Sequence, residues 1–214
     1  MLVCIAREFG SGGHEIGKRL AQMLGYAFYD QELVTEVVKK SNISPDTLEN
    51  ADEKRESPWL HRIFYDDGNK ELRGVTANEA MFRMQSAVIL EAAQKEHCVF
   101  VGRCADDVLK RAGIKRLSLF ITAPFHDRVD RKMQLTGMDE KSVTSLIRKT
   151  DKQRKSYYNF YADGNWGKPY NFDLCINSSA WGIEHTAKAL AVLVRQMEEV
   201  FEKKGEKGNV ELSI

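Results

Sequence analysis

The chain has 214 residues, of which 43% are hydrophobic and 29% charged, and its formal net charge is +1. This length fits one α/β domain over residues 1–214, and the near-neutral charge gives nucleic-acid binding no electrostatic support. No apolar run is long enough to span a membrane, and the four cysteines lack zinc or disulfide-framework spacing, so we expect a cytoplasmic protein.

The first predicted elements are a strand at residues 2–6 and a helix at residues 13–25, whose apolar stripe includes Ile16 and Leu20. A glycine-rich turn joins them. Glycines let backbone N–H groups approach an anion closely, and the helix N-terminus adds partial positive charge. The pattern therefore predicts a phosphate-binding loop, and an ordinary glycine-rich turn is the alternative. The residues expected to cradle the phosphates are Gly10, Ser11, Gly12, Gly13, His14 and Glu15.

The loop departs from the P-loop pattern, in which a lysine and a hydroxyl residue close the glycine-rich segment. With the turn placed at residues 10–12, Gly13 stands at the usual lysine position and His14 at the position of the hydroxyl that holds magnesium. The loop therefore keeps its backbone and lacks two side chains that would support catalysis.

The next elements are a strand at residues 26–29, which ends at Asp30, and a helix at residues 31–40. Residues 41–75 are polar and charged, which indicates an insertion outside the sheet. A helix follows from Thr76, a good N-cap, to about Glu96. Its residues at helical spacing are expected to be core rather than ligand contacts: Met81, Met84, Val88 and Ala92.

The second half of the chain continues to alternate strands and helices. We expect strands at residues 98–101, 117–121 and 172–176, in which the thiols of Cys98 and Cys175 are buried like that of Cys4. The expected helices are 106–112, 125–136, 139–160 and 183–203, with a loop at 161–170 and a frayed tail at 204–214.

Five strands alternating with helices predict a parallel sheet covered on both faces. Ligands of such sheets bind at the carboxyl ends of the strands. Polar residues follow each predicted strand, and their convergence indicates a site: Arg7, Asp30, Arg103, Thr122 and Asn177.

With these features the chain resembles the cytidylate kinase group of P-loop nucleoside monophosphate kinases, and most closely its divergent cytidylate kinase-like branch. Residues 4–25 are similar to the family's first strand, P-loop and helix, and residues 99–103 to its Gly-Arg motif. Residues 117–131 are similar to its Phe-Leu-Thr-Ala segment with the following helix, and residues 172–178 to its final strand.

The resemblance implies a three-layer α/β/α fold of the P-loop NTPase type. It also implies a nucleoside-monophosphate-binding insertion at about residues 41–96 and an arginine-bearing lid at about residues 139–170. ATP and Mg²⁺ are the implied cofactors. Arg148 and Arg154 would close the lid over the phosphates, and a solvated helix face is the alternative for them.

Several other residues have candidate roles beside structural alternatives. Arg7 leads into the loop and can replace the missing lysine charge, or it forms a salt bridge with Glu8 or Glu15. Asp30 can orient an acceptor hydroxyl, or it caps the next helix. Either Glu15 or Asp30 can recruit Mg²⁺. Arg103 suits a bidentate grip on a monophosphate. Two further arginines are expected to hold the acceptor, and the alternative is that they are solvated charges on a helix: Arg128 and Arg131.

These features predict a phosphotransferase that moves the γ-phosphoryl group of ATP to CMP or a related small acceptor. A nucleotide-sensing module without catalysis is the first alternative, and a kinase of a non-nucleotide small molecule is the second. Tyr157, Tyr158, Phe160 and Tyr161 form an aromatic cluster, which we expect to pack a hinge or a subunit contact; a homodimer is compatible with it.

Overall fold

The computed structural model describes residues 1–30 and 77–208. The predicted helix at 31–40, the segment at 41–75 and the Thr76 cap lie outside the described residues. The strands are β1 (Leu2–Arg7), β2 (Ala27–Tyr29), β3 (Cys98–Val101), β4 (Leu117–Thr122) and β5 (Leu174–Asn177). The helices are α1 (Gly13–Leu24), α4 (Ala77–Lys95), α5 (Ala105–Arg111), α6 (Phe125–Thr136), α7 (Glu140–Tyr161) and α8 (Gly182–Gly208), with a 3₁₀ turn at Pro169–Asn171.

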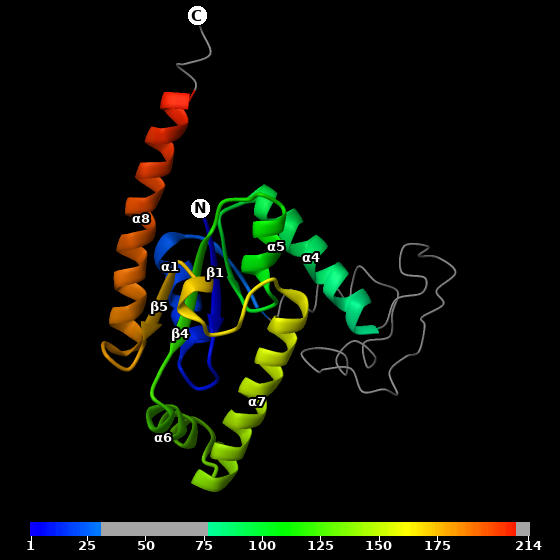
Figure 1. Cartoon of the computed structure of the whole chain (residues 1–214). Coiled ribbons are helices and arrows are strands. Elements are labelled where there is room, and N and C mark those ends of the chain that lie inside the picture. Colours follow the sequence, from blue (N-terminus) through cyan, green and yellow to red (C-terminus); the bar gives the residue numbers. More distant parts are fainter. Residues whose placement is uncertain (31–76, 209–214) are drawn as a thin grey trace, which may run out of the picture.

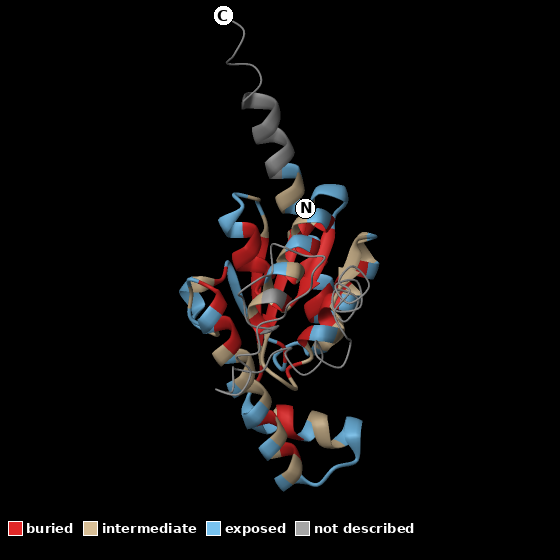
Figure 2. Cartoon of the chain, turned by 90° about the vertical axis from the view of Figure 1, so that its right-hand side faces the viewer, coloured by how far each residue is buried: buried red, intermediate tan, exposed pale blue. Residues whose placement is uncertain are grey.

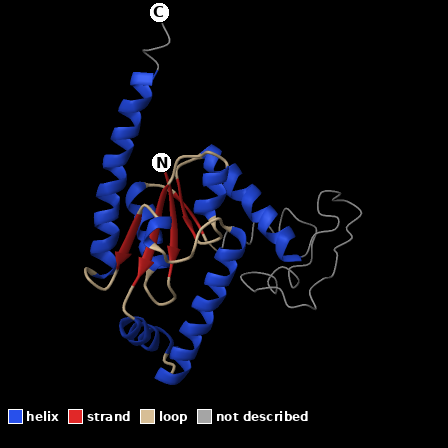
Figure 3. Cartoon of the chain, in the orientation of Figure 1, coloured by secondary structure: helices blue, strands red, loops and turns tan. Residues whose placement is uncertain are grey.

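The five strands form one parallel sheet in the order β2-β3-β1-β4-β5, with helices on both sides (Figures 1 and 3). In the central strand β1, Val3 pairs with Val99 of β3 and with Leu117 of β4. A strand buried on both faces needs apolar residues at successive positions, which is why residues 2–6 read as a continuous hydrophobic run. The structure confirms the predicted three-layer α/β/α fold.

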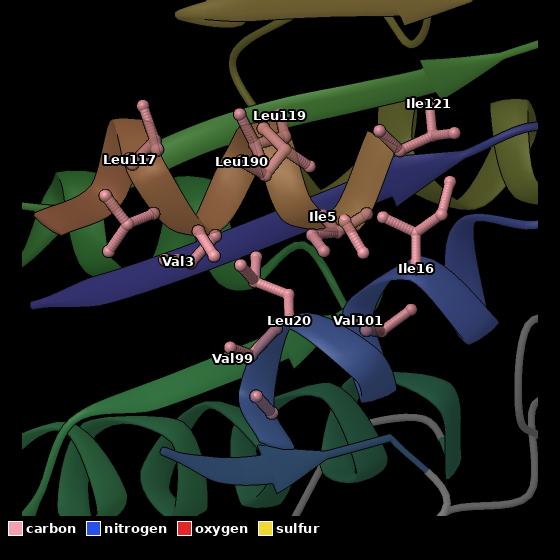
Figure 4. Packing of buried hydrophobic residues seen from close by; sticks show 14 residues of the cluster. Val3, Ile5, Ile16, Leu20, Val99, Val101, Leu117, Leu119, Ile121 and Leu190 are labelled. Carbon is pink, nitrogen blue, oxygen red and sulfur yellow. The ribbon is translucent and has the colours of Figure 1, made fainter. Parts of the chain in front are cut away.

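Alternate residues of the strands pack against different helices. One face of β1 carries Val3 and Ile5, which pack with Ile16 and Leu20 of α1 and with Leu190 of α8 (Figure 4). The other face packs against α4 and α5, where Met81, Val88 and Ala92 are buried as expected. Both layers hold the carboxyl end of β1 in place, so the loop that follows it starts from a rigid support.

Helix α6 and the start of α7 lie beyond the sheet, at the end of the molecule opposite the N-terminus (Figure 1). Figure 2 shows few buried residues there, separate from the main core. They form a small cluster of Val129 from α6 and Val143 and Ile147 from α7, against which Phe9 of the glycine loop packs. This cluster brings both helices to the edge of the sheet where the predicted site lies.

The structure corrects the sequence analysis in the last strand. β5 begins at Leu174 rather than at Phe172, because Phe172 packs into an aromatic cluster and Asp173 binds Ser118. Cys175 is exposed, not buried, since β5 is an edge strand with an uncovered face. The final helix continues to Gly208, five residues into the segment 204–214 that was expected to be frayed.

The aromatic cluster after the lid-like helix packs within the chain. Tyr157, Tyr158 and Tyr161 are buried with Phe120 and Phe172, whereas Phe160 is 65% exposed. The Tyr158 hydroxyl donates to Asp106, whose pKa is raised by burial. The three tyrosines therefore anchor the end of α7 to the sheet.

Candidate functional site

The turn between β1 and α1 depends on two glycines. Gly10 and Gly12 have φ angles of 86° and 79°, in the left-handed region that favours glycine. A Cβ atom on Gly12 would lie 2.8 Å from Ile183 Cδ1, and one on Gly10 would lie 3.0 Å from Arg128 Cβ. The backbone thus approaches its neighbours closely, and the first turn of α1 leaves N–H groups for an anion.

The side chain of Ser11 fixes this turn to neighbouring backbone. Its buried hydroxyl donates to the carbonyl oxygens of Glu8 at 2.9 Å and Ile121 at 3.1 Å. The Ser178 hydroxyl donates to the Ser11 carbonyl oxygen at 2.6 Å. The Ser11 N–H also donates to the Glu8 carbonyl oxygen, at 3.4 Å. Side chain and backbone of Ser11 are therefore engaged in positioning the loop.

Arg7 occupies the space that a P-loop lysine would need. A Cβ atom on Gly13 would lie 2.6 Å from Arg7 Cβ and 3.1 Å from Arg7 Cγ. The guanidinium reaches Gly102 after β3, where a Cβ atom would lie 2.1 Å from Arg7 Nη1. The absence of side chains at Gly13 and Gly102 thus creates the channel in which Arg7 lies.

Asp30 joins Arg7 and His14 into one charged group. His14 Nε2 is 2.9 Å from Asp30 Oδ2, and Arg7 Nη2 is 3.7 Å from Asp30 Oδ1. Burial acts to raise the pKa of Asp30, but the His14 hydrogen bond and the Arg7 charge lower it below its ordinary value. Asp30 is therefore an ionised partner of Arg7. Arg7 does form a salt bridge, but its partner is Asp30 and not Glu8 or Glu15, which the sequence suggested. The helix that Asp30 was expected to cap lies outside the described residues.

An open cleft of about 260 Å³ lies over the glycine loop. Gly10, Gly12, Gly13 and His14 line one side. Cations from two helices line the other: Arg131 and Lys132 from α6, and Arg154 from α7. Glu15 balances part of this charge through Arg131 Nη2, 2.6 Å from its Oε2. A cleft with free helix N–H groups and several cations fits a phosphate chain.

Lys132 lies among other positive charges of the cleft. Burial, followed by the positive charges of Arg131 and Arg154, lowers the pKa of its ammonium group. The Nζ atom lies 4.3 Å from the centre of the Phe9 ring. An anion bound in the cleft would relieve the repulsion among these cations.

We expect the affinity for a polyphosphate to fall as pH rises. The fall should begin at a lower pH than it would if Lys132 had the pKa of an ordinary lysine. The reason is that Lys132 loses its proton at its lowered pKa, and the neutral amine no longer attracts the anion. Calorimetric titration of tripolyphosphate across the alkaline range measures this, with Lys132→Arg as the control that stays charged. If Lys132→Arg lost affinity at alkaline pH to the same extent as the wild type, Lys132 would not be the group responsible.

A second, smaller cavity of about 30 Å³ adjoins the cleft. Arg103 lines it, in a left-handed conformation with φ of 60°, together with Asp106 and Tyr158. Arg7 and Arg154 line both this cavity and the cleft. These two arginines therefore border both spaces.

The structure does not bring all the predicted arginines together. Arg148 is exposed, with its guanidinium carbon 5.5 Å from the centre of the Phe125 ring. Arg128 is buried, and its Nη1 lies 2.6 Å from Asp151 Oδ2 while its Nε is 3.6 Å from Glu8 Oε2. Arg128 thus serves the internal structure of the loop, and neither arginine lines the cleft or the smaller cavity.

The two carboxylates expected to recruit Mg²⁺ are already engaged. Both oxygens of Glu15 accept from guanidinium groups, one from Arg19 at 2.9 Å and one from Arg131. Asp30 is held by His14 and Arg7. Within residues 1–30 and 77–208 no three potential metal-binding side chains cluster. This arrangement of Glu15 and Asp30 does not fit direct coordination of a metal ion.

The residues of the cleft that sequence analysis missed include Phe9 and Lys132. Lys132 follows Arg131 on a helix with charges all around it, so no periodicity distinguishes it. Phe9 stands between the first strand and the glycines, and the sequence analysis gave it no role. It is a large apolar side chain in a polar turn, and this unusual position could have indicated that it packs against another element.

Comparison with known protein families gives a match over most of the chain. The model of the cytidylate kinase-like family matches residues 2–180. An uncharacterized protein from Eubacterium ventriosum ATCC 27560 is 27% identical with a TM-score of 0.68, covering 91% of this chain and 98% of its own.

Two enzymes share the fold at lower identity. Shikimate kinase from Bacteroides thetaiotaomicron is 15% identical with a TM-score of 0.53, over 91% of this chain and 98% of its own. A gluconokinase from Sinorhizobium meliloti 1021 is 14% identical with a TM-score of 0.52, over 94% and 96%. No curated protein matches the chain. Across the described residues, none of the helices is both long and apolar enough to cross a membrane.

Proposed function

Since the chain belongs to the cytidylate kinase-like family, we propose that it is a phosphotransferase that moves the γ-phosphoryl group of ATP to CMP or a related small acceptor. The donor phosphates would lie in the cleft over Gly10, Gly12 and Gly13, and the reacting group of the acceptor would enter the smaller cavity at Arg103. The cytoplasmic location, the absence of a nucleic-acid partner and the homodimer stay predictions.

The observation that carries this proposal is the position of Arg7 and Arg154, which line both spaces. Phosphoryl transfer spreads negative charge over the transferred group, and the protein's work is to position both substrates and stabilise that charge. Two guanidinium groups at the junction are suited to this task because each can donate to phosphate oxygens in a bidentate manner.

Magnesium enters the proposal only as the partner of ATP, because Glu15 and Asp30 are engaged by cations. Mg²⁺ keeps several waters and is often held by one or two carboxylates together with phosphate oxygens. The steps assigned to this chain are therefore binding by the glycine loop, neutralisation by the arginines, and orientation of Arg7 by Asp30.

A second candidate is a nucleotide-binding module without turnover. It is favoured by the replacement of the P-loop lysine with Gly13, whose side-chain space Arg7 fills. Both candidates predict ATP binding in the same cleft, and they differ only in whether Arg7 supplies the charge that the chemistry requires.

The deciding experiment combines ATP binding by calorimetry with ATP consumption in the presence of Mg²⁺ over a panel of acceptors. The panel contains CMP, other nucleoside monophosphates and small hydroxylated acids. Turnover with CMP or another nucleoside monophosphate supports the proposal. Turnover only with a hydroxylated acid indicates a kinase of a non-nucleotide small molecule, binding without turnover indicates the sensing module, and absence of ATP binding contradicts all three.

A further inference from the structure

Phe9 connects the glycine loop to the α6–α7 pair. It stands between Glu8 and Gly10, but its side chain packs against Val129, Val143 and Ile147 of the two helices. A large apolar side chain in a phosphate loop has no direct part in binding anions. Its packing into a cluster outside the main core indicates that it positions the loop relative to the two helices.

The main chain of Phe9 is held from both sides by a charged pair. Its N–H donates to Asp151 Oδ1 at 2.7 Å, and its carbonyl oxygen accepts from Arg128 Nη1 at 3.1 Å. The pair itself is joined by Arg128 Nη1 and Asp151 Oδ2 at 2.6 Å, with side chains only 7% and 18% exposed. Because a carboxylate only accepts and a guanidinium only donates, the two peptide groups that flank Phe9 are each held in one orientation.

The ring of Phe9 also positions two cations of the cleft. Lys132 Nζ of α6 lies 4.3 Å from the ring centre, and Arg154 Cζ of α7 lies 5.5 Å from it. Both distances are within the range of cation–π attraction. One side chain of the loop thus sets the places of cations that come from two different helices, and both cations line the cleft.

We propose that Phe9 is a positioning residue that assembles the oligophosphate site by fixing Lys132 and Arg154 against the glycine loop. Through Arg128 and Asp151, the loop and the α6–α7 pair then act as one unit, in place of a lid that closes independently. The inference rests on the proposed function only in taking the ligand of the cleft to be an oligophosphate chain.

The test is calorimetric titration of ATP and of tripolyphosphate, without an acceptor, into the wild type, Phe9→Leu, Phe9→Tyr and Lys132→Met. Phe9→Leu keeps an apolar side chain and removes the aromatic face, so we expect about tenfold weaker binding of both ligands. Phe9→Tyr keeps the ring and is expected to bind like the wild type. Thermal unfolding of each variant shows whether it is folded.

The double variant Phe9→Leu with Lys132→Met separates positioning from general loosening. If Phe9 acts through Lys132, adding Phe9→Leu to Lys132→Met weakens binding by clearly less than the tenfold it causes alone. Independent, additive losses would overturn the inference, as would wild-type affinity in Phe9→Leu or weak binding in Phe9→Tyr.

Two further outcomes concern a variant that fails to fold and the distinction between this inference and the proposed function. Should Phe9→Leu fail to fold, Asp151→Asn replaces it, since it weakens the hold on the Phe9 peptide while keeping the side-chain shape. Tripolyphosphate binding that depends on Phe9, without turnover of any acceptor, would reject the kinase and leave this inference standing. If the protein turns over an acceptor but its ligand binding does not depend on Phe9, the kinase function stands and this inference is rejected. If the wild type binds neither ligand, both the kinase function and this inference are rejected.

Discussion

Replacing Arg7 with alanine is expected to lower the rate of phosphoryl transfer about a hundredfold to a thousandfold. Losing one preorganised donor to a developing charge has an effect of about this size in other enzymes. Arg7 is the cation nearest to the missing lysine position, since its stem lies against Gly13. Steady-state kinetics with the acceptor found in the panel measure the change, and thermal unfolding shows how much stability the Asp30 contact contributes.

A pair of further variants tests whether Arg7 replaces the lysine. Gly13→Lys alone is expected to destabilise the protein, because its Cβ atom would lie 2.6 Å from Arg7 Cβ. Arg7→Gly combined with Gly13→Lys removes this clash and places a lysine at the ordinary position. We expect the double variant to recover at least about tenfold of the rate lost in Arg7→Ala. Unchanged kinetics in Arg7→Ala would refute the role assigned to it.

Arg154→Ala is expected to lower kcat about a hundredfold, while Arg148→Ala changes it less than about threefold. Both arginines lie on α7, but only Arg154 lines the cleft and the smaller cavity, and its Nη1 lies 3.4 Å from the Arg7 carbonyl oxygen. Arg148 is exposed beside Phe125. The two variants remove the same charge from the same helix, so they are matched controls for each other.

The measurement is kcat and KM for both substrates in each variant. A loss in Arg148→Ala as large as in Arg154→Ala would mean that α7 presents Arg148 to the phosphates during turnover, as the lid resemblance implies. Equal activity of Arg154→Ala and the wild type would contradict the position given to Arg154 at the junction.

The sheet was predictable because its signal is local. Each of β1 to β4 is an apolar run bounded by polar residues, and each strand was predicted within a residue or two. β5 was placed two residues too early because Phe172 is as apolar as a strand residue, and its packing with Phe120 is a contact far along the chain. The exposure of Cys175 depends on the order of the strands, which no local pattern contains.

The site was predictable where it depends on the turn, and not where it depends on partners. Gly10 and Gly12 were expected in the turn, and they adopt the left-handed backbone that explains their presence. The burial of Arg128 was not predictable, because its partners Glu8 and Asp151 lie far away in the sequence. Lys132 gains its place in the cleft from the way α6 docks, through contacts with Phe9 that the sequence does not display.

The way Arg7 lies over Gly13 also constrains how such a loop changes over evolutionary time. A lysine cannot enter at position 13 while the Arg7 stem fills the space, and loss of Arg7 first leaves the loop without either cation. With the role proposed for Arg7, we expect both orders of single replacement to pass through an impaired protein. The two positions would then form a linked pair, and we expect a lineage with the arginine arrangement to return to the lysine one only by changing both together.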